Sequence, residues 1–136
     1  MEQRDFLQLQ IDHLGQALSK IFSKMLGIKE DGQSLQVANQ SLKEELGFNI
    51  DDLTALSIGE FIETLRQKEL SSDSFDKLAD ILLLSADELY ELQPGNEKSI
   101  NLYHKCLKIY HHLENADSVY PFERQLKIER IKKLTL

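Results

Sequence analysis

The stretch LYHKCLKIYHHLENAD, which begins at Leu102, holds the only cysteine of the chain and three of its four histidines. Cysteine and histidine bind zinc and also serve as nucleophile and base, so this stretch is the first candidate for chemistry. On a helix, however, Cys106 falls in the middle of the apolar arc that contains Leu102 and Ile109. His104 and His111 stand two turns apart, about 10.5 Å, which is too far for one ion. We therefore expect a buried cysteine, surface histidines and no metal site.

A stripe of carboxylates is the second candidate. Asp76, Asp80, Asp87 and Glu91 fall within about 60° of one another if residues 73–92 form a helix. Like charges four residues apart weaken a helix unless cations face them. The last segment carries five such cations: Arg124, Lys127, Arg130, Lys132 and Lys133. Pairing within the chain is the simplest interpretation, and contact with a basic partner or a solvated face are the alternatives.

Signals for other chemistry are missing from the sequence. The stripe lacks the central glycine of a calcium loop, and the chain has no glycine-rich phosphate loop and no GxSxG turn. The net charge of −7 opposes binding to nucleic acid, and the basic C-terminal residues are mixed with Glu123 and Glu129. We therefore predict no catalytic residues, no cofactor, no nucleic-acid partner and no enzymatic activity.

Length and composition indicate one globular domain over residues 1–136. The chain is 41% hydrophobic and 29% charged, and its single cysteine permits no internal disulfide. It shows neither a signal-peptide pattern nor a run of about 18 apolar residues, so we expect a cytoplasmic protein without membrane contact. The charge is uneven, because residues 31–97 carry 4 basic and 15 acidic side chains while residues 98–136 carry 8 basic and 4 acidic ones.

Apolar spacing predicts helices throughout, and thus an all-α fold. Residues 1–30 are expected to form a long amphipathic helix with its apolar residues 3 or 4 apart. This seam consists of Leu7, Ile11, Leu14, Leu18, Ile21, Met25 and Ile28. Because the flanks of the seam are mostly uncharged, we expect it in the core of a bundle, with coiled-coil pairing of two chains as the alternative.

Residues 34–70 read as a central segment of three shorter helices. Ser34–Leu46 is followed by Gly47, the usual residue after a helix end. Asn49 or Asp51 can cap a short helix, and Ser57 with Glu60 matches a capping box that opens a helix to about residue 70.

Residues 73–136 are expected to form three longer helices in hairpins. They span about 73–92, 96–113 and 118 to the end, with Pro121 in the first turn of the last one. The last helix has apolar residues on two sides: Phe122 and Leu126 on one, and Tyr120, Ile131 and Leu134 on the other. One explanation is that both sides are covered, the second by the first helix or by another chain; fraying of the end is the alternative.

The segment ADELYELQPGNEKSINLYHKCLKIYHHL resembles the helix-turn-helix of a tetratricopeptide repeat. Together with LKEELGFNIDDLTALSIGEFIETL and DFLQLQIDHLGQALSKIF, it is similar to an uncharacterised bacterial family of small all-helical proteins, a domain of unknown function with a tetratricopeptide-like C-terminal part. The resemblance implies a helical array and supplies no activity or site residues.

The sequence thus favours a non-enzymatic protein–protein interaction module, with an unidentified protein or a second copy of the chain as partner. Its candidate contact residues are Asp76, Asp80, Asp87, Glu91, Ile131 and Leu134. One alternative is a homo-oligomeric assembly protein. Another is a small-ligand binder or enzyme that uses carboxylates and the tyrosines Tyr90, Tyr103 and Tyr110 in a pocket between helices.

Overall fold

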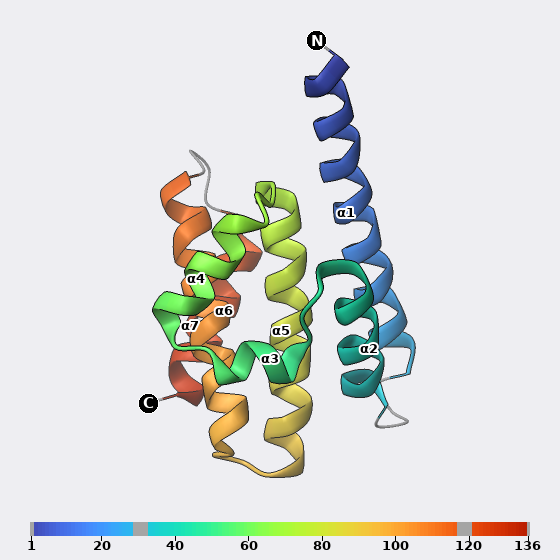
Figure 1. Ribbon diagram of the computed structural model, residues 1–136. Coiled ribbons are helices and arrows are strands. Elements are labelled where there is room, and N and C mark those ends of the chain that lie inside the picture. The colour runs from blue at the N-terminus through green and yellow to red at the C-terminus, as the bar shows by residue number, and fades with distance from the viewer. Residues whose placement is uncertain (1, 29–32, 117–120, 136) are drawn as a thin grey trace.

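A computed structural model describes residues 2–28, 33–116 and 121–135, with the side chains of residues 2–12 and 116 outside the described part. Within these ranges the chain forms seven α-helices and no strand, which confirms the all-α prediction (Figure 1). The helices are α1 (Glu2–Gly27), α2 (Ser34–Leu46), α3 (Ile50–Ala55), α4 (Ile58–Gln67), α5 (Ser72–Leu92), α6 (Glu97–Ala116) and α7 (Phe122–Leu134).

An antiparallel hairpin of α5 and α6 forms the centre of the molecule, and these two helices share the most extensive contact. Gly95 has a φ of 79° in the connecting turn, a conformation that glycine adopts without steric cost. The side chain of Asn96 then accepts hydrogen bonds from the N–H groups of Lys98 (2.8 Å) and Ser99 (3.2 Å), which starts α6. The sequence therefore ends one helix and starts the next within four residues.

The other helices surround this hairpin (Figure 1). Helices α1 and α2 pack against each other and against α5, while α3 and α7 contact α6. The N-terminal part of α1 extends past the start of α5 and beyond the rest of the bundle (Figure 1). Gly15 lies where α1 passes the start of α5, 3.4 Å from side-chain atoms of Asp73 and Ser74 when a Cβ is placed on it.

The described part of the seam of the first helix, from Leu14 to Met25, lies in the core. Leu18 and Met25 have no exposed surface, Ile21 is 6% exposed, and Leu14 packs against the same cluster. The predicted seam residues Leu7 and Ile11 lie outside the described side chains.

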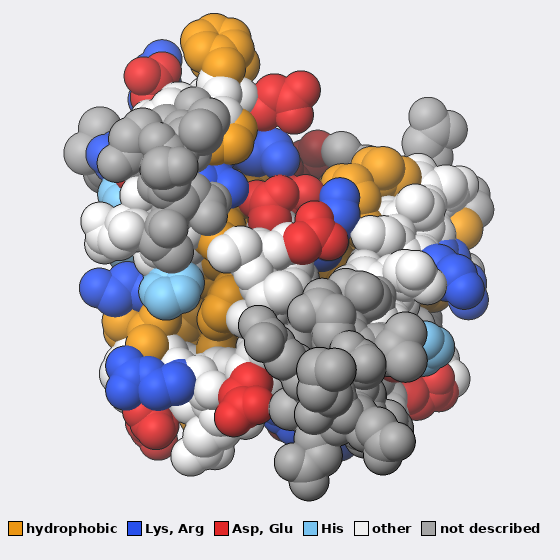
Figure 2. Space-filling view, turned by 90° about the horizontal axis from the view of Figure 1, so that it is seen from above, with side chains coloured by type: hydrophobic (Ala, Val, Ile, Leu, Met, Phe, Trp, Pro, Cys, Tyr) orange, Lys and Arg blue, Asp and Glu red, His pale blue; other side chains and the backbone are white. Residues whose placement is uncertain are grey.

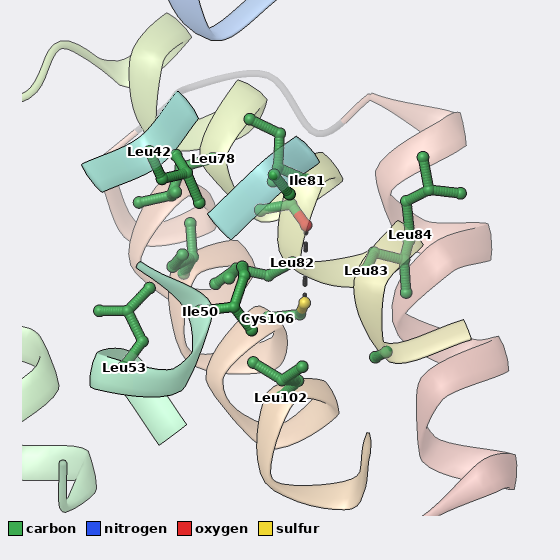
Figure 3. Packing of buried hydrophobic residues seen from close by; sticks show 14 of the residues in the cluster. Leu42, Ile50, Leu53, Leu78, Ile81, Leu82, Leu83, Leu84, Leu102 and Cys106 are labelled. Atoms are coloured by element: carbon green, nitrogen blue, oxygen red, sulfur yellow. Dashed lines mark hydrogen bonds between the residues drawn. The ribbon is translucent and has the colours of Figure 1, made fainter. Parts of the chain in front are cut away.

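Side chains of all seven helices contribute to one apolar cluster. Figure 3 shows its centre, where side chains of α2 and α3 meet those of the central hairpin. The labelled residues there are Leu42, Ile50, Leu53, Leu78, Ile81, Leu82, Leu83, Leu84, Leu102 and Cys106. Among the described residues, no helix is both long and apolar enough to cross a membrane.

The predicted caps are present. Asn49 starts α3 and Ser57 starts α4, each with the reciprocal bonds of a capping box to Asp52 and Glu60. Gly47 ends α2 with a left-handed φ of 85°.

Some predicted boundaries were wrong. Helix α4 ends at Gln67 rather than near residue 70, because Glu69 adopts a left-handed φ of 52°. Helix α6 runs three residues past Leu113, to Ala116. Helix α7 begins at Phe122, since Pro121 has an extended ψ of 135° and precedes the helix instead of lying in its first turn. The predicted start near Ser118 and the apolar Tyr120 lie outside the described residues.

Candidate functional site

Cys106 is a core residue and not a nucleophile. Its side chain is fully buried, and the thiol donates a hydrogen bond to the carbonyl oxygen of Ala79 at 3.5 Å (Figure 3). Burial, helped by the charges of Asp87 and Asp80, raises the pKa of the thiol well above its ordinary value. The thiol therefore stays protonated, whereas a reactive cysteine needs its thiolate.

The histidines of α6 point outward and do not converge. His104, His111 and His112 are exposed. His111 Nδ1 lies 3.8 Å from a carboxylate oxygen of Glu114, and the ring of His112 packs against that of Phe75 with centroids 5.0 Å apart. These positions confirm the expectation of a buried cysteine and surface histidines. Within residues 13–28, 33–115 and 121–135, no group of three or more His, Cys, Asp or Glu side chains is placed to hold a metal ion.

The carboxylate stripe of α5 pairs with cations of α7, as the intramolecular interpretation predicted. The pairs are Asp76–Arg124 at 3.9 Å, Asp80–Lys127 at 2.8 Å and Asp87–Arg130 at 2.8 Å. The guanidinium of Arg130 donates through both terminal nitrogens to the two carboxylate oxygens of Asp87 (2.8 and 3.0 Å), a geometry that is among the stronger ion pairs. Glu91, the last member of the stripe, is exposed near the end of α5.

Two tyrosines of α6 complete this network. The hydroxyl of Tyr103 donates to Asp87 at 2.6 Å, and that of Tyr110 donates to Asp80 at 3.2 Å. The two tyrosines are seven residues apart on α6, and the two aspartates are seven residues apart on α5. The same Tyr–Asp–cation arrangement therefore occurs twice along the antiparallel hairpin. Burial raises the pKa of both hydroxyls above the ordinary range; Asp87 adds to the effect at Tyr103, and Cys106 and then Asp80 add to it at Tyr110. The tyrosines therefore act as permanent donors that join α6 to α5.

Asp76 differs from the other carboxylates in its environment. Burial raises the pKa of its carboxyl, and the charge of Asp80 adds to the effect, while Arg124 and Lys127 oppose it. Its ion pair is also the longest of the three, at 3.9 Å. The network is thus strongest around Asp80 and Asp87.

Ile131 and Leu134 of α7, which were predicted as partner contacts, lie on the side of the helix that faces the core. Ile131 has an exposed fraction of 0%, so it faces the core and presents no surface to a partner, and Leu134 is partly buried against the same cluster. The opposite side remains open, with Phe122 75% and Leu126 51% exposed. One apolar side is therefore covered within the chain, and the other is not.

A buried lysine holds the end of α3. Lys105 is 1% exposed, and its Nζ donates to the carbonyl oxygen of Leu56 (2.9 Å) and to the side chain of Asn101 (2.6 Å). The ammonium also lies 5.8 Å from the centroid of the Phe61 ring. Burial lowers the pKa of this ammonium. Its position suits a structural role, because a cation favours the C-terminal end of a helix.

An apolar pocket lies between the C-terminal end of α4, the start of α5 and the end of α6. Its volume is about 220 Å³. We call it the α4–α6 pocket; it is lined by Ile62, Leu65, Leu70, Phe75 and Ile109, with Arg66, Glu69 and His112 as its polar lining residues. Figure 2 views the molecule from this end, where apolar side chains are visible beside a histidine and basic side chains.

The sequence left open a ligand pocket lined by Tyr90, Tyr103 and Tyr110, but these three side chains are used in packing and hydrogen bonds within the bundle. Tyr103 and Tyr110 are buried with their hydroxyls bonded to carboxylates, and Tyr90 packs edge-on against Tyr103 with centroids 6.1 Å apart. A small hollow of about 120 Å³ is lined by Asp80, Asp87 and Lys127 together with Phe22, Leu83 and Leu84. The α4–α6 pocket, with about 220 Å³, is larger than this hollow.

The sequence did not predict this pocket, because its lining residues come from three helices and from the loop before α5, and the pocket forms only through the packing of these parts. Within α4, Phe61 and Leu65 are buried, whereas Ile62 is only partly buried.

No protein-family model, no curated protein and no solved structure matches this chain.

Proposed function

We propose that the chain is a non-enzymatic protein–protein interaction module of the cytoplasm, with the α4–α6 pocket at the centre of its contact surface. The observation that carries this proposal is the pocket itself, an apolar hollow that no side chain of the described residues fills. Interaction surfaces commonly have an apolar centre that receives one anchor side chain, surrounded by a polar rim. The pocket has such a composition, with five apolar residues next to Arg66 and Glu69.

The residues best suited to chemistry support this proposal, because each has a structural role. The tyrosines and aspartates of the central hairpin hold α7. Lys105 holds the end of α3, and Cys106 fills the core. A protein that binds through shape and charge needs no reactive group at its contact surface.

Affinity capture with matched variants tests the proposal. The full-length tagged chain would be incubated with lysate of its source organism, and the bound proteins identified by mass spectrometry. Arg66→Glu reverses a charge at the pocket on a side chain that is 74% exposed, so the fold is not at risk. Lys20→Glu, an exposed lysine on α1, is the control for charge reversal away from the pocket.

We expect the wild type and Lys20→Glu to capture the same few proteins and Arg66→Glu to lose them. The affinity of the purified partner would then be measured by calorimetry and should fall at least about tenfold with Arg66→Glu. Equal capture by all three chains would refute the pocket as the contact surface. Capture of nothing above background would refute the interaction module.

A small apolar ligand is the second candidate for the same pocket, supported by its volume. An apolar cavity of about 150 Å³ in another protein binds benzene, so 220 Å³ has room for a somewhat larger aromatic or aliphatic body. A ligand of this kind stabilises the folded state by mass action. Screening aromatic and aliphatic compounds by thermal shift and by NMR of the pocket methyl groups would identify one.

A further inference from the structure

Helix α7 packs against the central hairpin with one side only (Figure 1). Ile128 and Ile131 on that side are 3% and 0% exposed, whereas Phe122 and Leu126 on the outer side are 75% and 51% exposed. Within the described part of the chain, no helix covers this outer side. Helix α7 can therefore separate from the hairpin without displacing another described helix.

The apolar attachment of α7 is small. Three of its residues are buried, and one of these is Arg124, so Ile128 and Ile131 are its only fully buried apolar side chains; Leu134 adds a partial contact. Helix α5, in comparison, has ten buried residues. Since the stabilisation from burial grows with the apolar area removed from water, α7 is held by far less of it than the two helices of the hairpin.

Electrostatic attraction makes up much of the remaining attachment. Helix α7 carries five basic and two acidic side chains, and α5 carries six acidic and one basic. Three ion pairs join the two helices, through Arg124, Lys127 and Arg130. The side chains of Lys127 and Arg130 are 33% and 45% exposed, so dissolved ions reach them and screen their attraction to α5. The attachment of α7 should therefore depend on ionic strength.

We propose that α7 is a detachable helix, which leaves and rejoins the hairpin as one unit while α1 to α6 stay folded, and that ionic strength sets the fraction of open molecules. Parts of a protein with few buried apolar contacts open at a lower free energy than the whole domain. Opening takes the cations away from Asp76, Asp80 and Asp87. The open form therefore exposes an acidic surface that the closed form neutralises. This inference goes beyond the proposed function and does not depend on the α4–α6 pocket.

Amide hydrogen exchange of the full chain at pH 7 tests the proposal, in about 20 mM and about 500 mM NaCl. Charges attract each other over roughly 20 Å at the lower salt concentration and over roughly 4 Å at the higher one. After correction for intrinsic rates, the amides of residues 126–134 should exchange at least about tenfold faster than those of residues 81–84 in the buried part of α5. The higher salt concentration should accelerate exchange in α7 about tenfold further and change exchange in α5 less than about twofold.

Two matched variants show whether the ion pairs are responsible. Arg130→Gln removes the double hydrogen bond to Asp87 and should accelerate exchange in α7 about tenfold at low salt, with a smaller further effect of salt. Lys98→Gln is the control, because Lys98 also forms an ion pair between helices, with Asp51 of α3, and is similarly exposed at 37%. It should change exchange in α7 less than about twofold.

Three results would overturn the proposal. Equal exchange rates in α7 and α5 would show that the molecule opens only as a whole. Exchange in α7 that does not respond to salt would show that charge does not control the opening. Equal effects of Arg130→Gln and Lys98→Gln on α7 would show that its own ion pairs do not hold it. The first two results come from the wild type and need no variant to fold, and none of the three affects the capture experiment with Arg66→Glu.

Discussion

Replacing Asp87 by alanine removes the carboxylate that joins three helices. Asp87 of α5 accepts a hydrogen bond from the hydroxyl of Tyr103 on α6 and two from the guanidinium of Arg130 on α7. Tyr103 is 1% exposed, so its hydroxyl cannot find water in exchange. The Arg130 side chain is 45% exposed and regains water easily. The cost of the substitution therefore comes mainly from the tyrosine.

The magnitude follows from these two environments. A buried hydrogen bond to a charged group contributes about 1.5–3 kcal/mol, and an ion pair of a half-exposed arginine adds about 0.5–1 kcal/mol. Alanine is the better helix former and returns about 0.5 kcal/mol. We expect Asp87→Ala to lower the free energy of unfolding by about 2–3 kcal/mol, a large part of the stability of a typical domain.

Urea unfolding of Asp87→Ala, Tyr103→Phe and the double variant measures this effect and divides it. Tyr103→Phe should cost about 1.5–2 kcal/mol, and the double variant should cost little more than Asp87→Ala. Glu45→Ala, an exposed carboxylate of α2, is the control and should change the free energy by less than about 0.5 kcal/mol.

The coupling energy between Asp87 and Tyr103 decides the argument. We expect about 1–2 kcal/mol from the double-mutant cycle. If the single effects simply add, the hydrogen bond does not contribute as inferred. If Asp87→Ala costs no more than Glu45→Ala, the network does not hold the helices together.

Three further predictions concern stability. Gly15→Ala should raise the free energy of unfolding by up to about 1 kcal/mol, because it removes a glycine from the middle of α1 and the new Cβ meets Ser74 Oγ at an acceptable 3.4 Å; thermal unfolding by circular dichroism measures this. Glu69→Gly should raise it by about 1 kcal/mol in urea unfolding, since glycine tolerates the left-handed φ of 52° at the end of α4. Hydrogen bonds from Asn49 and Ser57 hold the pKa values of the Asp52 and Glu60 carboxyls below their ordinary range. Since the folded-state pKa values are the lower ones, the stability that the two capping boxes add is complete above the unfolded-state values. It is lost as the pH falls through the folded-state values, so the acid limb of a pH–stability curve should flatten in Asp52→Asn and Glu60→Gln.

Local signals in the sequence carried most of the fold. The spacing from Leu18 to Met25 predicts an apolar helix face, and that face is buried. Capping residues predict helix starts because their bonds are made within a few residues, and Asn49 and Ser57 have those bonds. The predicted start of α7 was wrong because it depends on packing and not on local hydrogen bonds. Pro121 suits either a first turn or an extended residue before a helix, and only the packing of α7 selects the second.

The candidate site was predictable only in part. The pairing of the α5 carboxylates with the cations of α7 was predictable, because like charges four residues apart on one helix are stabilised by opposite charges that face them. The α4–α6 pocket was not predictable, since its size depends on the distance between three helices. The exposure of Phe122 and Leu126 was equally hidden, because α7 has apolar residues on both sides and its sequence does not say which side faces inward.

The Tyr–Asp–cation network determines which side of α7 faces inward. Ile128 and Ile131 bury one side of α7, but Phe122 and Leu126 would offer a rotated helix a comparable apolar surface. Rotation would carry Lys127 and Arg130 away from Asp80 and Asp87, leaving two buried tyrosine hydroxyls beside carboxylates without their cations. That loss, about 1 kcal/mol or more for each pair, exceeds any gain from exchanging one apolar side for the other. The network thus sets the rotation of α7 as well as holding it, and it leaves Phe122 and Leu126 facing outward.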